Sequence, residues 1–145
     1  MKFEESKWNG CPIRYAAEII GDKWTFLILR DLMFRNKSSY TALLHSSEKI
    51  STNILADRLR KLEKHGMLEK SVDPDNKKQF IYALSKKGLD LMPTMLSLFA
   101  WSCEYDDETH LPASLVGEAK RDPWGLAKQL RQGKALALNT EKSSR

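Results

Sequence analysis

The sequence has few cysteines and no long apolar run, and both features narrow the class of protein. Its two cysteines, Cys11 and Cys103, are too few for a disulfide scaffold, and no Cys/His cluster has the spacing of a zinc site. No run of about 18 apolar residues occurs, so we expect no membrane-spanning helix. Because charged residues are frequent in positions 2–7, we expect no signal peptide. These absences favour a cytoplasmic protein with reduced thiols, no metal and no cofactor.

The positive charge is concentrated in the middle of the chain. The 145 residues carry 24 Lys+Arg and 19 Asp+Glu, a net charge of +5, at a length typical of one domain. Residues 51–88 hold 9 basic and 5 acidic side chains, whereas the mostly apolar residues 89–104 hold only 2 acidic ones. A basic segment followed by an apolar one favours two roles, contact with an anion and burial of surface. The alternative is an ordinary solvated face.

Hydrophobic periodicity predicts a mainly α-helical chain with one small β-hairpin. We expect a tail over 1–10, a main domain over 11–105 and a helical extension over 106–145 that ends in a disordered tail from about residue 140. The expected helices lie at about 12–20, 23–34, 40–45, 52–65, 86–105, 113–121 and 123–131, and the strands at 67–72 and 79–84. Helix starts are indicated by Pro12, by Asp22, by Ser38 or Ser39, and by Ser51 or Thr52.

Residues 40–66 have the pattern of a helix-turn-helix, whose second helix enters the major groove of DNA. On that second helix Leu55, Leu59 and Leu62 share one face, while the opposite face is polar and basic toward its C-terminal end. The hairpin that follows is then a wing, with Lys77 and Lys78 at its tip. The candidate DNA-binding residues are Ser39, Ser51, Thr52, Asn53, Asp57, Arg58, Lys61, Lys77 and Lys78.

Two of these assignments have ordinary structural alternatives. Arg58 falls beside the apolar face, so it either packs its stem with its head on an acid such as Asp31 or Glu63, or contacts a phosphate from the flank of the helix. The lysines at the hairpin tip are either phosphate contacts or simply exposed turn residues. We favour the DNA role for the lysines because a helix-turn-helix precedes them.

The predicted helix over 86–105 is apolar on two sides, so it needs a cover on two sides. Met92, Met95, Leu96 and Phe99 form one stripe, and Leu91, Leu98 and Tyr105 form the other. One stripe can pack against the protein's own domain. The other stripe then needs a second chain to cover it, so the sequence predicts a partner chain. Pro93 is expected to bend this helix in its first turns.

Several short segments carry a family resemblance in their order and spacing: Cys11-Pro12, residues 20–25, Ile28-Leu29, Ile50-Ser51, Leu55, Arg58-Leu59, Leu62-Glu63, Gly66-Met67-Leu68, residues 82–88, Pro93 and Trp101. Over about residues 11–105 the sequence resembles HxlR-type winged helix-turn-helix transcriptional regulators, which are related to the MarR group. The resemblance implies a bacterial homodimer, built through terminal helices, that binds double-stranded DNA at a palindromic operator. We expect a repressor, with an activator as the alternative. Asp22 and residues 36–40 depart from the usual family pattern, and the 106–145 extension is longer than the usual core.

The sequence offers two candidate triggers for such a regulator. Cys11 precedes a helix start, where backbone N–H dipoles favour a thiolate, and some HxlR-type proteins sense oxidants through a cysteine at this place. The alternative is a small packed residue. A small-molecule effector is the second trigger, in a pocket lined by Trp24, Met92, Met95, Phe99 and Trp101, although residues of these types at helical spacing also form plain core.

Enzymatic function is disfavoured by the same sequence. The three histidines are scattered without a paired nucleophile, and no glycine-rich phosphate loop or metal motif is present. The stronger alternative is a winged helix that contacts only proteins. Such a module would not need a basic helix face and a basic wing together, so we expect a DNA-binding regulator.

Overall fold

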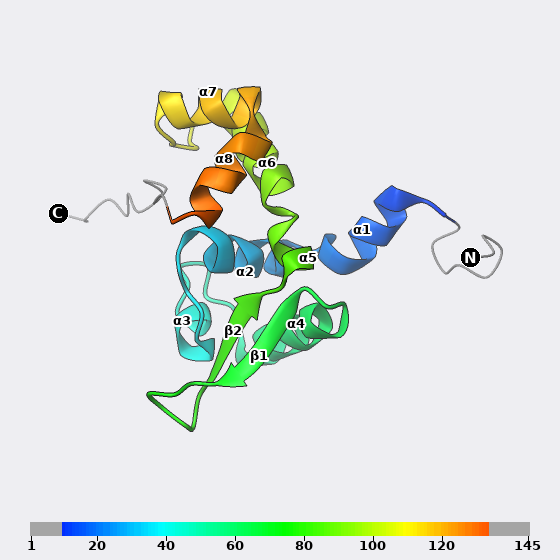
Figure 1. Ribbon diagram of the computed structural model, residues 1–145, viewed down its shortest axis with the longest axis vertical. Coiled ribbons are helices and arrows are strands. Elements are labelled where there is room, and N and C mark those ends of the chain that lie inside the picture. Colours follow the sequence, from blue (N-terminus) through cyan, green and yellow to red (C-terminus); the bar gives the residue numbers. More distant parts are fainter. Residues whose placement is uncertain (1–9, 134–145) are drawn as a thin grey trace.

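The computed structural model describes residues 10–133. Its helices are α1 (Pro12–Ile20), α2 (Lys23–Phe34), α3 (Tyr40–Leu44), α4 (Thr52–Lys64), α5 (Lys86–Leu89), α6 (Met92–Tyr105), α7 (Ala113–Arg121) and α8 (Pro123–Arg131), and its strands are β1 (Leu68–Val72) and β2 (Phe80–Leu84) (Figure 1). The mainly helical architecture and the hairpin agree with the sequence prediction. The predicted tails over 1–9 and 140–145 lie outside the described residues.

Side-chain caps begin the helices at the predicted residues. Asp22 Oδ1 accepts a hydrogen bond from the Trp24 amide at 2.7 Å, and the Ser39 and Ser51 hydroxyls accept from the amides of Ala42 and Ile54 at 3.1 and 3.3 Å. These bonds satisfy amides that have no partner within the helix. The caps therefore fix where α2, α3 and α4 begin, and with them the turn between α3 and α4.

The hairpin forms the wing predicted for residues 67–84. Its strands are antiparallel, with Leu68 opposite Leu84 and Val72 opposite Phe80. The backbone amide of Tyr82 donates to the Ser38 carbonyl at 2.8 Å, which attaches the segment before α3 to the edge of β2. The wing is thereby connected to the helix-turn-helix by main-chain hydrogen bonding as well as by packing.

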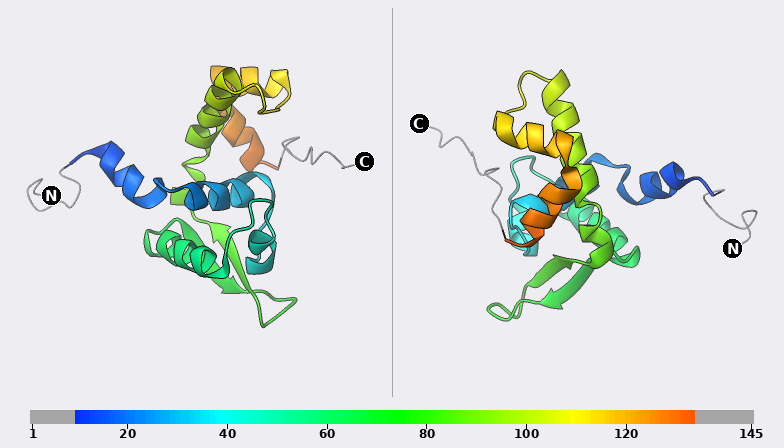
Figure 2. Two further views of the ribbon diagram at one scale, coloured as in Figure 1. Left: turned by 180° about the vertical axis from the view of Figure 1, so that it is seen from behind. Right: turned by 45° about the horizontal axis from the view of Figure 1, so that its top comes forward.

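Two apolar clusters hold the described part of the chain together. The first lies among α2, α3, α4 and the hairpin, and includes Leu29, Leu55, Leu59 and Leu62, each at most 1% exposed. The second joins α6 to α7 and α8 around Leu96 and Ala119. The extension over 106–131 thus packs two further helices, α7 and α8, against α6, as Figures 1 and 2 show.

The structure corrects the prediction of one helix over 86–105, because two helices occupy this range and are interrupted at Asp90 and Leu91. Pro93 lacks the amide hydrogen that a helix interior needs. In a continuous helix its ring would also clash with the carbonyl oxygen of Leu89, four residues earlier. Proline is tolerated only in a first turn, so a new helix begins at Met92. The bend predicted for Pro93 is therefore a break that lies before it.

Helix α1 is only partly buried within the described residues, with Ile20 packed at the edge of the first cluster. Ile19 is buried, but Ile13 is 76% exposed and Ala17 is also exposed. Helix α1 projects away from the rest of the molecule in both Figure 1 and Figure 2. Among the described residues, no helix is long and apolar enough to cross a membrane.

Candidate nucleic-acid interface

Helix α4 exposes the polar face that the helical period predicts. Leu55, Leu59 and Leu62 are buried against α2 and the hairpin. The opposite side carries the exposed residues Thr52, Asn53, Asp57, Arg60 and Lys64, together with the half-buried Lys61. Because α4 starts at the end of a tight turn, its N-terminal residues and free amides are open to an approaching polyanion. Helix α4 thus has the geometry of a recognition helix.

Two predicted contact residues use their hydroxyls inside the fold. Ser39 and Ser51 accept the capping hydrogen bonds that start α3 and α4. Each hydroxyl keeps its own hydrogen, which is free to point outward as a donor. Ser51 is exposed and Ser39 is half-buried, so Ser51 is the more accessible of the two.

Arg58 pairs with an acid that sequence reasoning did not name. Its Nε donates to Asp22 and its Nη1 lies 2.6 Å from Asp57 Oδ2, so neither Asp31 nor Glu63 is the partner. Partial burial alone would raise the pKa of Asp22, but hydrogen bonds from Arg58 and the Trp24 amide bring it below its ordinary value. The hydrogen bond to Asp22 in turn raises the pKa of Arg58. The pair connects the start of α2 to the middle of α4.

The wing tip presents Lys77 and Lys78 to solvent. Asp73 shapes the turn, since its carboxylate accepts from the Asp75 amide at 2.9 Å and from Gln79 Nε2 at 3.0 Å. These hydrogen bonds, led by the one from Asp75, lower the pKa of Asp73. Within residues 10–133 neither lysine ammonium has an ion-pair partner, so both charges are available at the tip.

A basic groove between α4 and the wing was not among the predicted sites. It encloses about 310 Å³ and is lined by Tyr40, Ala56, Arg60, Glu63, Lys70, Phe80 and Tyr82. The Lys70 ammonium lies 3.9 Å from the centre of the Phe80 ring, a cation–π contact that holds the cation beside the groove. The helical period had placed Arg60 on the polar face of α4. The alternation of side chains along the strand could have indicated Lys70.

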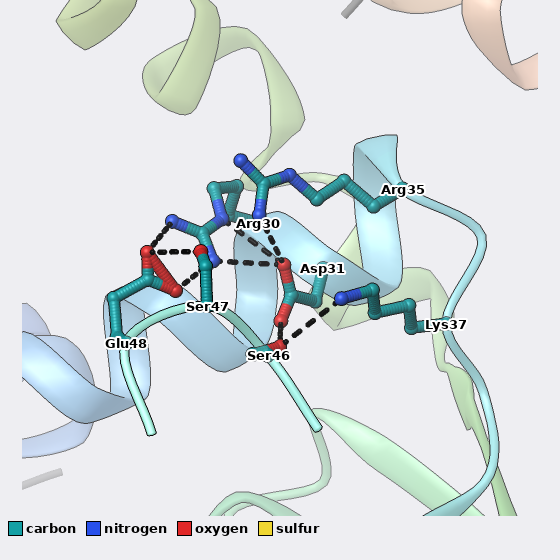
Figure 3. A network of polar contacts seen from close by, with 7 residues as sticks. All are labelled: Arg30, Asp31, Arg35, Lys37, Ser46, Ser47 and Glu48. Atoms are coloured by element: carbon teal, nitrogen blue, oxygen red, sulfur yellow. Dashed lines mark hydrogen bonds and ion pairs between the residues drawn. The ribbon is translucent and has the colours of Figure 1, made fainter. Parts of the chain in front are cut away.

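The turn before α4 is held by a charged network that links it to α2 (Figure 3). Arg30 binds Glu48 through two nitrogens, at 3.0 and 2.6 Å, and also donates to Asp31 at 2.9 and 3.0 Å. Asp31 is 1% exposed and also accepts from the Ser46 hydroxyl. The hydrogen bond from Arg30 lowers the pKa of Glu48 to about 2. In this turn Lys49 has a φ of 56°, a left-handed conformation that is uncommon for a residue other than glycine.

The predicted trigger residues lie outside this surface. Cys11 is exposed, and its sulfur accepts the Arg14 amide at 3.4 Å as the cap of α1. The predicted effector-pocket residues lie in different parts of the described structure, and their role stays a prediction. Met92 and Met95 are buried in different clusters, and Trp24 packs at the edge of the first. Phe99 and Trp101 line two separate surface hollows, because successive turns of α6 turn them to different sides.

The comparisons with known proteins agree with this geometry. The model of the HxlR-like helix-turn-helix family matches residues 19–110, which include α2, the helix-turn-helix and the whole wing. The chain belongs to the HxlR-like helix-turn-helix family. It is a transcriptional regulator of the DNA-binding, winged-helix kind rather than an enzyme, as its sequence predicts.

Relatives and solved structures match about two thirds to three quarters of this chain. The chain is 28% identical over 106 residues to the HTH-type transcriptional regulator sll1512 of Synechocystis, covering 73% of this chain and 78% of that one. It is 30% identical over 96 residues to the HTH-type transcriptional regulator YodB of Bacillus subtilis, covering 66% and 85%. The structure of reduced YodB matches 69% of this chain and 98% of that one, with a TM-score of 0.55 and 27% identity. A structure of MarR, at 20% identity and a TM-score of 0.50, shares the fold.

Proposed function

We propose that this HxlR-type protein is a repressor that binds a palindromic operator as a homodimer. The observation that carries the proposal is that α4 and the wing both lie in the half of the molecule away from α7 (Figures 1 and 2). Lys61 of α4 and the tip residues Lys77 and Lys78 then face one duplex. Phosphate neutralisation by these cations supplies most of the affinity, which falls steeply with salt.

The two parts of the surface have different roles in this proposal. The N-terminal end of α4 enters the major groove, where Thr52, Asn53, Asp57 and Lys61 read base edges. The wing lysines contact the neighbouring phosphates or the minor groove. Arg58 is a positioning residue, because its guanidinium is already occupied by Asp22 and Asp57. Since Asp57 is 57% exposed, it can still turn toward a base.

Apolar surface on α1 and α6 supports the dimer. Ile13 on α1 is 76% exposed, while Leu98, Trp101 and Tyr105 on α6 are 39%, 63% and 72% exposed. These α6 residues recur every three or four positions, so they form one stripe along the helix. Such a stripe on a monomer is costly in water and is removed by a second copy. Two copies related by a two-fold axis would present two α4 helices to the two halves of a palindrome.

Cys11 is the proposed site at which oxidants change DNA binding. It is exposed at the start of α1, one of the helices assigned to the dimer. A structure of diamide-treated YodB, at 28% identity and a TM-score of 0.52, supports thiol chemistry within the family, because diamide oxidises thiols. Oxidation of Cys11 would alter the start of α1 and hence the spacing of the two α4 helices.

A charge-reversal pair tests the DNA-binding surface. Lys61→Glu with Lys77→Glu should abolish binding to genomic DNA fragments, while the dimer stays intact by light scattering. The matched control is Arg121→Glu with Lys128→Glu, which makes the same change in net charge on exposed positions of α7 and α8. Equal losses in both double variants would mean that only the overall charge matters. Absence of DNA binding in the parent dimer would favour a module that contacts only proteins.

A further inference from the structure

A surface hollow beside the charged network has the size and lining of a small-molecule site. It lies between α2, α6 and the connection from α6 to α7 and encloses about 470 Å³. Its lining residues are Leu27, Arg30, Arg35, Phe99, Ser102, Cys103, Thr109, His110 and Leu111. A volume of this order is typical of sites that bind small organic ligands. Of the pocket residues predicted from the sequence, it includes Phe99 alone.

The lining divides into an apolar part and a cationic part. Leu27, Phe99 and Leu111 supply the apolar surface, and Phe99 is held by the Phe34 ring at a centroid distance of 4.9 Å. Arg30 and Arg35 supply positive charge, and no lining residue is a carboxylate. A ligand that matches both parts has an aromatic ring and one negative charge.

Arg35 has the capacity to hold that charge. Its one ion pair within the described chain is a 3.5 Å contact from Nη1 to Asp31 Oδ1, and that oxygen already accepts two closer bonds from Arg30. A guanidinium carries five N–H donors in a planar fork that fits a carboxylate. Figure 3 shows the Arg35 side chain next to Arg30, above the Asp31 carboxylate. Most of the Arg35 donors are therefore available to a ligand.

We propose that this hollow binds a small aromatic carboxylate. The ring packs on Leu27, Phe99 and Leu111, and the carboxylate accepts hydrogen bonds from Arg35. The site includes Thr109, His110 and Leu111 from the connection that leads into the α7–α8 extension. The extension thus contributes one wall of the site.

The site also has a direct connection to the helix-turn-helix, which rests on the proposed DNA-binding function. Arg30 lines the hollow and at the same time binds Glu48 in the turn before α4. A carboxylate in the hollow competes with Asp31 and Glu48 for the two guanidinium groups. Weaker bonds to Glu48 release the turn, so the ligand should lower the affinity for DNA.

Calorimetry on the DNA-free protein tests the site independently of DNA binding. The probe is 1-naphthoate, and the uncharged probe of similar shape is 1-naphthalenemethanol. Naphthoate should bind more tightly than the alcohol, and Arg35→Gln should weaken naphthoate binding by about tenfold or more with little change for the alcohol. Arg35→Lys keeps the positive charge without the planar fork of donors, so its affinity for naphthoate should lie between those of the parent and Arg35→Gln. Arg121→Gln, at an exposed position of α7, is the matched control and should bind as the parent does.

Equal affinities for the two probes, or equal losses in Arg35→Gln and Arg121→Gln, would overturn the site. A second arm measures DNA affinity with and without naphthoate in the parent and in Arg35→Gln. A reduction confined to the parent supports the connection to the turn, and unchanged DNA affinity in the naphthoate-saturated parent overturns that connection. If the ligand-free parent binds no DNA at all, the proposed function fails, while calorimetry still decides the site.

Discussion

Arg58 of α4 and Asp22 of the α2 cap form an ion pair between residues 36 positions apart in the sequence. Asp22 accepts the Trp24 amide with one oxygen and Arg58 with the other. One carboxylate therefore starts α2 and at the same time fixes the position of α4. The Arg30–Glu48 pair does the same for the turn before α4, so two charged links orient the recognition helix relative to α2.

The Arg58–Asp22 link should contribute modestly to stability, because both side chains are partly solvated. A double-mutant cycle with Arg58→Met and Asp22→Asn, measured by urea unfolding, should give a coupling free energy of about 0.5–1 kcal/mol. Asparagine keeps the cap of α2, so its effect isolates the charge. A coupling near zero would show that the pair does not hold α4.

Glu48 should make stability depend on pH in acid. Its pKa is about 2 in the folded protein against an ordinary value of 4.5, so its contribution is complete above about pH 5 and is lost as the pH falls toward 2. Glu48→Gln removes this dependence. The difference in unfolding free energy between the parent and Glu48→Gln should therefore shrink from pH 6 to about pH 2.5 in urea titrations. A difference that stays constant over this range would contradict the role of the Arg30 hydrogen bonds.

Diamide should change the DNA affinity of the parent through Cys11. Cys11→Ser should abolish the response while leaving basal DNA binding unchanged, because serine can still cap α1. Cys103→Ser serves as the control, since Cys103 is half-buried on α6 and should leave the response intact. Fluorescence anisotropy titrations with DNA, before and after diamide treatment, measure the basal affinity and the response in the parent and in both variants. An oxidant response that persists in Cys11→Ser would exclude this cysteine as the sensor.

Trp101 should be central to the dimer interface, because it is 63% exposed and lies between Leu98 and Tyr105 in the apolar stripe of α6. Trp101→Glu places a charge in the contact and should shift the protein from dimer to monomer at micromolar concentration, as measured by light scattering. Phe80→Glu is the control, because Phe80 is 44% exposed on the wing and not on α1 or α6. A dimer that survives Trp101→Glu would place the interface elsewhere.

Local features of this protein could be predicted from the sequence, and long-range pairings could not. Caps such as Asp22 and Ser51 and the buried face of α4 depend on neighbours within one or two turns, so spacing alone indicated them. The partner of Arg58 lies in another helix, and spacing carries no information about it. The same holds for Glu48, which sequence reasoning did not single out because it looks like any exposed acid in a turn.

The predicted effector pocket stays a prediction, because it depends on packing between helices that residue spacing does not show. Aromatic and methionine residues at helical spacing identify an apolar helix, but they do not tell which faces are later covered. The packing of α7 and α8 on α6 buries Met92 and leaves Trp101 outside. The hollow that does form depends on Arg30, Arg35 and a connection outside the predicted domain of 11–105.

The central claim, that the α4 face and the wing read an operator as a dimer, is tested most directly by selecting bound duplexes from a random DNA pool and sequencing them. The account predicts an inverted repeat with half-sites one helical turn apart, about 10 base pairs between centres. Thr52→Ala and Asn53→Ala should relax the preference at defined positions of each half-site. A folded dimer that enriches no sequence would contradict the account.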